Sequence, residues 1–334
     1  MVKTPTSNDT IFGLDISEAK QILASLRRKV SKRFLLIEFG IDSLTYCEAR
    51  VINDQVFYSK VNRISIEKKA IERGTPTDAE TMASFITQLI DEEQICAHRV
   101  GITLPPQAAL SKTIYLPDHL NYKEAIEYIS NPSSSGFQFP IPLENTDFDI
   151  VPLSCMPIDK KNKTKAYFLS SIPKKLVDNV ITTLTKAGLE LHSLDISYSS
   201  LGRLAITEIN KLEKKQVIIL IELSLECTHF QIISEDGPIH VTTLAAIKSF
   251  NTQENHQGDK SIEEHTISSE DYLAISQLDL KVLFNEIKDE LDNLKRKYNL
   301  QFNEIILSGI NSSHPGINKF FKDRFNIKTK TLRS

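Results

Sequence analysis

The stretch Leu36-Ile37-Glu38-Phe39-Gly40-Ile41-Asp42-Ser43 decides the expected fold, because a run of apolar residues ends in glycine, aspartate and serine. This pattern is typical of a buried strand that closes in a tight turn. Two further strand-like runs follow at residues 44–52 and 55–66, with a turn signal at Asn53-Asp54 between them. Three consecutive strands with short turns predict a β-meander.

A helix and a fourth strand are expected to complete this part of the chain. Residues 77–92 carry apolar side chains at helical spacing, and Thr77-x-x-Glu80 predicts a capping box at the start of the helix. The run at residues 99–104 predicts a strand that ends at Pro105. Strands and helices that alternate in this way indicate an α/β fold.

Residues 108–168 follow a different pattern. They combine short strand-like runs, one helical run at 122–129 and a proline-rich stretch, which predicts a subdomain inserted into the α/β fold. The chain then predicts a helix at 174–187 that stops at Gly188, a strand to Leu194, and a second helix from Asp195 to about Leu212.

The meander pattern recurs in the second half of the chain. Strand-like runs occupy 216–223, 228–234 and 238–244, and a long amphipathic helix is expected at 278–298. This repetition predicts a duplicated fold with two lobes. The expected divisions are a polar tail and basic helix at 1–33, a first lobe at 34–107 and 169–212, an inserted subdomain at 108–168, and a second lobe at 213–334.

Composition excludes several classes of protein. The 40 basic residues nearly balance the 43 acidic ones, so no global positive field favours nucleic acid. The most apolar run is interrupted by Glu222, and it is far shorter than the ~20 residues that span a bilayer, so any membrane contact should be peripheral. No signal peptide is expected. Only 11 glycines occur in 334 residues, so each glycine near a predicted ligand site matters.

Cysteine and histidine spacing indicates no metal site. Cys47, Cys96, Cys155 and Cys227 lie far apart, with no histidine at zinc spacing, and are expected to be reduced core residues. The histidines expected to be ordinary surface or core residues, without Cys, Asp or His partners at ligand spacing, are His98, His192, His229 and His240. The sequence contains neither the Gly-x-Ser-x-Gly motif of serine hydrolases nor the Gly-x-x-x-x-Gly-Lys motif of P-loop proteins.

The order of these pieces resembles the type IV pilus assembly proteins of the PilM family and their actin-like relative FtsA, from about residue 34 to 325. The pieces that carry the resemblance are residues 36–43, Leu104-Pro105, Thr113-Ile114-Tyr115-Leu116-Pro117, Phe139-Pro140-Ile141-Pro142-Leu143-Glu144, Phe148-Asp149, Lys186-Ala187-Gly188-Leu189 and Ile305-Ile306-Leu307-Ser308-Gly309. The resemblance implies an actin-like (ribonuclease H-like) two-lobed α/β fold.

The resemblance also implies where ATP and magnesium would bind. Relatives hold ATP with two Asp-x-Gly hairpins and a Gly-Gly adenosine loop, which present carboxylate and bare backbone. The corresponding positions here are Glu38, Gly40, Ser43, Glu222, Ser224, Thr228, Ser308 and Gly309. We expect these eight residues to face any bound cofactor.

This chain departs from the family pattern in all three motifs. Glu38 and Glu222 replace aspartate, Ser224 stands where glycine is expected, and Ile310 follows Gly309 in place of a second glycine. Glutamate moves the carboxylate by ~1.5 Å, which octahedral magnesium tolerates poorly. Glu38 and Glu222 can also be simple polar strand ends. We therefore expect ATP and magnesium binding to be weak or lost, with no catalytic and no metal-ligating residue assigned.

The expected function is that of a scaffold. The resemblance implies a cytoplasmic protein, peripheral at the inner membrane, that binds the short tail of a PilN-like protein in a groove between the first and inserted subdomains. A functional FtsA- or PilM-type ATPase is the alternative, and a sugar or acetate kinase is a more distant one on the same superfold. Asp195 can position a water in such an enzyme or simply cap a helix, and the capping interpretation is preferred.

Residues 17–33 predict a basic amphipathic helix. It carries six basic residues against Glu18, a net charge of +5, beside a narrow apolar stripe. Two interpretations stay open: contact with an acidic surface such as anionic lipid, or packing of the stripe on the first lobe.

Overall fold

The chain is described by a computed structural model that covers residues 10–11, 14–15, 32–40, 42–66, 70–72, 74–131, 142–156, 158–213, 216–224, 227–247, 249–250, 266–269, 272–298 and 300–332. The chain forms two compact units, one of residues 1–108 and 174–196 and one of residues 109–173 and 197–334. The predicted basic helix at 17–33 lies outside the described residues except for its last two positions. The predicted limits of the lobes and of the inserted subdomain stay a prediction.

The first unit is built on a six-stranded mixed sheet with the order β13-β9-β3-β4-β5, in which β6 also pairs with β4. Its strands are β3 (Arg33–Phe39), β4 (Ser43–Ile52), β5 (Gln55–Tyr58), β6 (Asn62–Ser65), β9 (Arg99–Leu104) and β13 (Glu190–Ile196). β3 is antiparallel to β4 and parallel to β9. Alternate residues of β3, namely Leu35, Ile37 and Phe39, are buried on one face.

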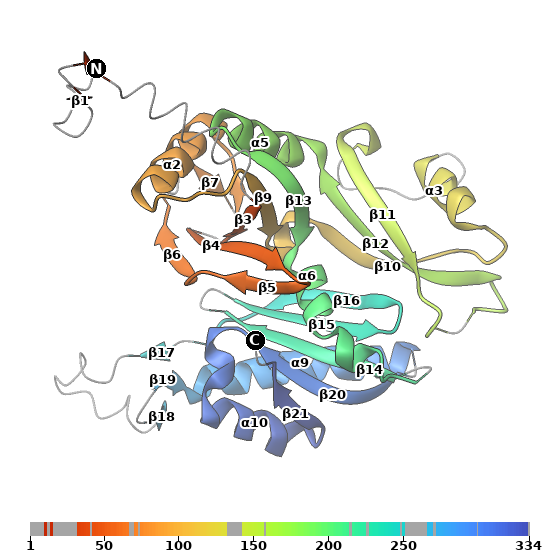
Figure 1. The fold of residues 1–334 in the computed structure, drawn as a ribbon. Coiled ribbons are helices and arrows are strands. Elements are labelled where there is room, and N and C mark those ends of the chain that lie inside the picture. The colour runs from red at the N-terminus through yellow and green to blue at the C-terminus, as the bar shows by residue number, and fades with distance from the viewer. Residues whose placement is uncertain are drawn as a thin grey trace. The chain divides into compact units, whose positions relative to one another are not determined.

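Two helices, α2 (Ala79–Glu92) and α5 (Lys174–Lys186), pack against each other beside this sheet (Figure 1). α2 buries one face at helical spacing, including Met82, Ile86 and Leu89. Smaller elements of the unit are β1 (Thr10–Ile11), β2 (Leu14–Asp15), β7 (Ile71–Glu72), β8 (Thr75–Pro76) and η2 (Pro106–Ala108).

Two predictions about this unit are wrong in detail. The run at 55–66 is not one strand, because β5 and β6 both pair with the same long strand β4, at its two ends. The helix cap is also different: Asp78, not Thr77, accepts hydrogen bonds from the backbone N of Glu80 and Thr81 at 3.0 and 3.2 Å. Asp78 lies directly before the first helical residue, where a carboxylate reaches these orphan N–H groups.

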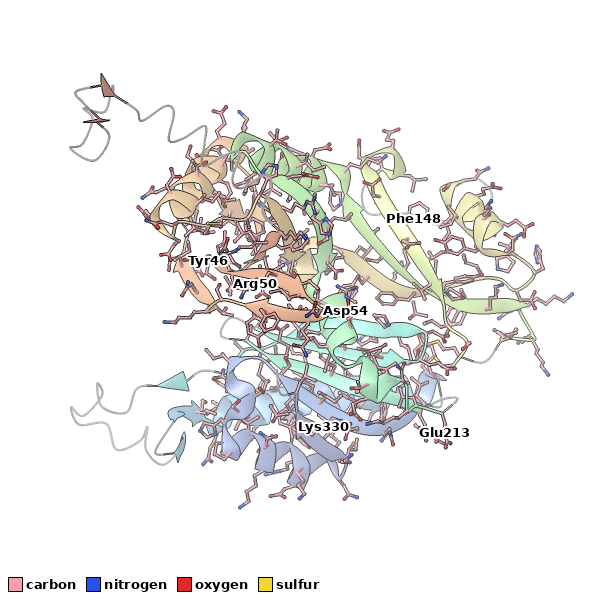
Figure 2. All side chains as sticks on the ribbon, in the orientation of Figure 1. Tyr46, Arg50, Asp54, Phe148, Glu213 and Lys330 are labelled. Carbon is pink, nitrogen blue, oxygen red and sulfur yellow. The ribbon has the colours of Figure 1, made fainter. Side chains whose placement is uncertain are left out.

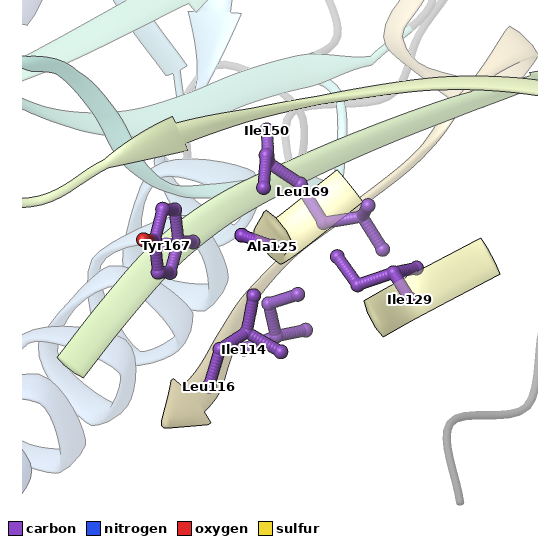
Figure 3. Packing of buried hydrophobic residues seen from close by; sticks show 7 residues of the cluster. All are labelled: Ile114, Leu116, Ala125, Ile129, Ile150, Tyr167 and Leu169. Atoms are coloured by element: carbon purple, nitrogen blue, oxygen red, sulfur yellow. The ribbon is translucent and has the colours of Figure 1, made fainter. Parts of the chain in front are cut away.

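The second unit contains a three-stranded sheet of order β10-β12-β11, formed by β10 (Leu110–Pro117), β11 (Thr146–Pro152) and β12 (Thr164–Pro173). Helix α3 (Tyr122–Ser130) covers it and begins in a capping box between Asn121 and Glu124. The buried residues of this layer form their own cluster, drawn in Figure 3: Ile114, Leu116, Ala125, Ile129, Ile150, Tyr167 and Leu169. The short helix η3 (Leu143–Asn145) precedes β11.

The main sheet of the second unit has the order β16-β15-β14-β20-β21. Its strands are β14 (Gln216–Leu223), β15 (Thr228–Ser234), β16 (Gly237–Leu244), β20 (Gln301–Ser308) and β21 (Lys328–Thr331). Its helices are α6 (Ser197–Leu204), α7 (Ile206–Ile209), α9 (Gln277–Tyr298) and α10 (Pro315–Phe325), and η4 (Ile310–Ser313) follows β20. The five consecutive residues from Val217 to Ile221 are all buried, so both faces of β14 are covered.

The meander of β14, β15 and β16 and the long helix α9 confirm the sequence predictions for this region. A small sheet of β17 (Ser249–Phe250), β18 (Thr266–Ser269) and β19 (Tyr272–Ser276) was not predicted. The helix expected from Asp195 is also corrected: Asp195 belongs to strand β13, and α6 begins two residues later, at Ser197. Continued parallel pairing with β9, up to Ile196 opposite Leu104, keeps Asp195 in the sheet.

An ion network around the buried carboxylate of Glu304 joins β20, β21 and α7. The Glu304 side chain, only 5% exposed, lies 2.7 Å from Nζ of both Lys328 and Lys330. Lys330, labelled in Figure 2, also lies 2.9 Å from Glu208. Two lysines therefore share the neutralisation of one buried carboxylate.

No helix in the described part of the chain combines the length and the apolar character needed to cross a membrane.

Candidate functional site

The predicted site residues of the second unit meet at one edge of its main sheet. Strands β14 and β20 run parallel, so their carboxyl ends lie together, with Glu222 opposite Ser308. The antiparallel hairpin to β15 places Glu222 opposite His229 and Leu223 opposite Thr228. The carboxyl end of parallel strands is where open α/β sheets bind ligands.

Ser224 closes the turn between β14 and β15. Its Oγ donates to the carbonyl of Cys227 at 2.7 Å and accepts from the backbone N of Cys227 at 3.2 Å. The backbone N of Ser224 also donates to the Cys227 carbonyl, at 3.2 Å. The Ser224 hydroxyl therefore already accepts the hydrogen bond that the Cys227 N–H can donate.

Gly309 lies directly against this turn. Its φ is +86°, and a Cβ at this position would stand 2.5 Å from the carbonyl oxygen of Leu223. No real Cβ tolerates that distance, so only glycine lets β20 end so close to the hairpin. Ile310 follows with a side chain that is 67% exposed, so it lies at the surface of the unit.

Glu222 is engaged by a histidine. Its Oε2 lies 2.7 Å from Nδ1 of His229, and the side chains are 16% and 13% exposed. On the other side of the imidazole, Nε2 of His229 lies 3.0 Å from Sγ of Cys227. The hairpin thus carries a chain of contacts Cys227, His229, Glu222, which we call the hairpin triad.

The charge of His229 follows from these contacts. Burial lowers the pKa of His229, but the hydrogen bonds to Cys227 and Glu222, together with electrostatic interactions with both groups, outweigh burial and raise the pKa to about 9. The imidazole is therefore protonated at neutral pH, and both ring nitrogens donate.

Thr228 is completely buried, and its Oγ1 meets no hydrogen-bond partner among the described residues. The hydroxyl does not face solvent in this structure, and a role in cofactor binding stays a prediction. Ser308, the last residue of β20, is half-buried beside Glu222.

The first unit carries the other predicted residues. Glu38 is exposed near the end of β3, where it pairs with Thr45 on one side and Thr103 on the other. The backbone N of Gly40 donates to the carbonyl of Ser43 at 2.8 Å, which closes the predicted tight turn.

Ser43 is buried at the start of β4, and its Oγ accepts from Nε and one terminal nitrogen of Arg63, at 3.1 and 2.9 Å. Arg63 lies on β6 and was missed by sequence reasoning, since nothing in the sequence shows that β6 returns to pair with the start of β4.

The sequence predictions for histidine and cysteine need correction. His229 is not an ordinary isolated histidine, because hairpin register places Glu222 beside it and the turn places Cys227 beside it. The sequence could have indicated this contact, because Glu222 and His229 are equally distant from the centre of the predicted turn and therefore lie opposite each other in the hairpin. None of the four cysteines forms a disulfide, but of the four only Cys155 is buried, so the core prediction is wrong for Cys47, Cys96 and Cys227.

Comparison with known proteins now decides the family. The model of the type IV pilus assembly protein PilM matches residues 37–246 of this chain. The chain belongs to the PilM family. The resemblance drawn from the sequence motifs is thereby confirmed, and no curated protein matches the sequence.

Solved structures agree on the fold. The structure of a PilM-PilN type IV pilus biogenesis complex is similar over 89% of this chain and 87% of that chain, with 17% identity and a TM-score of 0.63. The predicted fold class, an actin-like α/β fold, is thereby confirmed.

Two more distant structures also match. A protein of unknown function with an actin-like ATPase fold from Bacteroides thetaiotaomicron is 10% identical over 91% of this chain and 92% of that chain, with a TM-score of 0.46. The cytoplasmic domain of EpsL, an inner-membrane component of the type II secretion system of Vibrio cholerae, is 9% identical over 83% and 82%, with a TM-score of 0.41.

Magnesium-bound ATP, which the actin-like family implies, does not fit the second hairpin of this PilM-family chain as it stands. The Glu222 carboxylate is held by a protonated imidazole, whose positive charge opposes a nearby divalent cation. The Cys227 N–H is already bound by Ser224. Within the described residues, no three His, Cys, Asp or Glu side chains gather in a way that could hold a metal ion.

Proposed function

We propose that this chain is a scaffold of type IV pilus assembly that works in the cytoplasm at the inner membrane and binds the short tail of a PilN-like protein. The family match over residues 37–246 supports the pilus role. The similar solved structure is a complex of PilM with PilN, which supports the choice of partner.

The proposal includes a nucleotide site that is weak or lost. The observation that carries this part is the 2.7 Å ion pair between Glu222 and His229, which occupies the carboxylate expected to face the metal. Ser224 and Glu38, in place of glycine and aspartate, work in the same direction. A scaffold can perform its role without hydrolysis.

We expect no ATP hydrolysis by the purified chain: with ATP and magnesium present, phosphate should appear no faster than in a control without protein. Phosphate release and ATP binding are to be measured in the same titration. Ser224→Gly frees the Cys227 N–H and is expected to strengthen ATP binding by about threefold to tenfold, the value of one hydrogen bond. Magnesium-dependent turnover that disappears in Glu222→Ala would contradict the proposal.

The alternative function is a working ATPase of the FtsA or PilM type. It is favoured by the two glycines that survive, Gly40 in a closed turn and Gly309 packed on the second hairpin. In that case ATP and magnesium must displace His229 from Glu222, and turnover in the same titration would favour the ATPase over the scaffold.

We further propose that the basic segment 17–33 helps to hold the chain at anionic lipid. Its net charge of +5 supports this, since each basic residue near such lipid contributes about 1 kcal/mol before screening. The full chain is expected to co-sediment with anionic liposomes at low salt more than a chain that begins at Arg33, and salt should weaken the difference. Equal sedimentation would leave the segment as a packing element.

A further inference from the structure

The hairpin triad has the geometry of an activated nucleophile. Cys227 Sγ lies 3.0 Å from Nε2 of His229, and Nδ1 of the same ring lies 2.7 Å from Oε2 of Glu222. A nucleophile beside an imidazole, with a carboxylate that orients the imidazole, is the arrangement by which proteins activate serine and cysteine. Its carboxylate, Glu222, is also one of the residues predicted to face a bound cofactor.

A metal site is not an equivalent interpretation of the same three residues. The sulfur and the carboxylate contact opposite nitrogens of one ring, so no single ion can be bound by all three side chains. The contacts instead place a protonated imidazole between two acceptors. The geometry therefore places a proton partner directly beside the sulfur.

The position of the sulfur is fixed by its own turn. The Ser224 Oγ holds both the backbone N and the carbonyl of Cys227, at 3.2 and 2.7 Å. Cys227 as a residue is half-buried, and its sulfur is held 3.0 Å from the ring nitrogen.

The other three cysteines have no such arrangement. Burial raises the pKa of Cys47 and of Cys155, which suppresses the thiolate at both positions. Cys96 is half-buried like Cys227, but its Sγ donates to the carbonyl of Gln94 at 3.5 Å. Cys96 is therefore an internal control, because it is half-buried to a similar degree.

We propose that Cys227 is a covalent modification site for small soft electrophiles, and for peroxides in particular, with His229 as its proton partner and Glu222 as the positioning residue. In the reaction with hydrogen peroxide, Cys227 Sγ bonds to one peroxide oxygen and the O–O bond breaks. The sulfur is oxidised to a sulfenic acid, and the departing hydroxide takes the proton from His229 and leaves as water. Glu222 keeps the ring turned toward the sulfur.

The test compares alkylation rates within one molecule. The reduced full chain is treated with iodoacetamide at pH 7, and the rate at each cysteine is measured by peptide mass spectrometry. Cys227 is expected to react at least about tenfold faster than Cys96, and the ratio should approach one in urea, because the advantage comes from the fold. A Cys227 rate equal to or below that of Cys96 in the folded chain overturns the proposal.

Variants separate the roles of the partners. The variant His229→Gln is expected to lower the alkylation rate of Cys227 by about tenfold, and Glu222→Gln is expected to lower it by less. In both variants the alkylation rate of Cys96 should stay unchanged. An unchanged Cys227 rate in folded His229→Gln overturns the assignment of the proton partner. In a second assay, the wild-type chain is treated with hydrogen peroxide and dimedone, which should label Cys227 before the other cysteines. If a variant does not fold, the wild-type alkylation rates and the dimedone label still test the proposal.

Discussion

Replacing Gly309 with alanine is expected to lower the free energy of unfolding of the second unit by about 3 kcal/mol or more. Two costs add at this position. The backbone has φ +86° and ψ 170°, a combination that is essentially restricted to glycine. A Cβ would also overlap the backbone of Leu223, with contacts of 2.5 Å to O, 2.8 Å to C and 2.9 Å to N. Backbone atoms in a sheet cannot swing aside as a flexible side chain can.

Gly188→Ala is the matched control. Its φ is +70°, but nothing lies within 4 Å of the added Cβ, so only the backbone strain of about 1 kcal/mol remains. Urea unfolding followed by circular dichroism compares the two variants with the wild-type chain. Equal losses for both glycines would mean that β20 does not end against the hairpin as described.

The second large effect is expected at the ion network around Glu304. Lys330→Met should lower the free energy of unfolding by about 2 kcal/mol, because it removes the cation shared by Glu208 and the nearly buried Glu304. Lys328→Met is the control. Lys328 touches Glu304 at the same 2.7 Å, but its side chain is 76% exposed, so about 0.5 kcal/mol is expected. A larger loss in Lys328→Met than in Lys330→Met would contradict this ranking.

At acid pH, the difference in the free energy of unfolding between Lys330→Met and the wild-type chain should become smaller. Hydrogen bonds from Lys330 and then Lys211 lower the pKa of Glu208 to about 2 from its ordinary 4.5. Because the folded-state pKa is depressed, the contribution of Glu208 is complete above pH 4.5 and is lost as pH falls toward 2. Unfolding curves at pH 7 and pH 3 measure this change.

Much of the fold could be predicted from the sequence. The run from Val217 to Ile221 is apolar throughout and is followed by turn residues, so β14 and its hairpin follow directly from pattern. The limits of other elements depend on tertiary pairing. Asp195 stays in a strand because β9 continues beside it, and β5 separates from β6 because both pair with β4.

The candidate site was predictable only in part. Glu222, Ser224 and Gly309 were expected to lie together from the motif order, and the parallel pairing of β14 and β20 brings them to one edge. The partners of these residues were not predictable from spacing alone. Whether the Glu222 carboxylate faces solvent or contacts His229 depends on the side-chain rotamer, which the linear pattern does not encode.

The measurement that tests the central proposal most directly is a count of surface pili by electron microscopy in a clean deletion of the gene. A PilM-family scaffold predicts that pili are lost and that the wild-type chain restores them. The variant Glu38→Ala, which removes the exposed carboxylate of the first hairpin, should restore them equally, since no hydrolysis is needed. If a folded Glu38→Ala variant does not restore pili, the proposal of a scaffold without ATPase activity is contradicted. Normal pili in the deletion, with no second copy of the gene present, would contradict the pilus role itself.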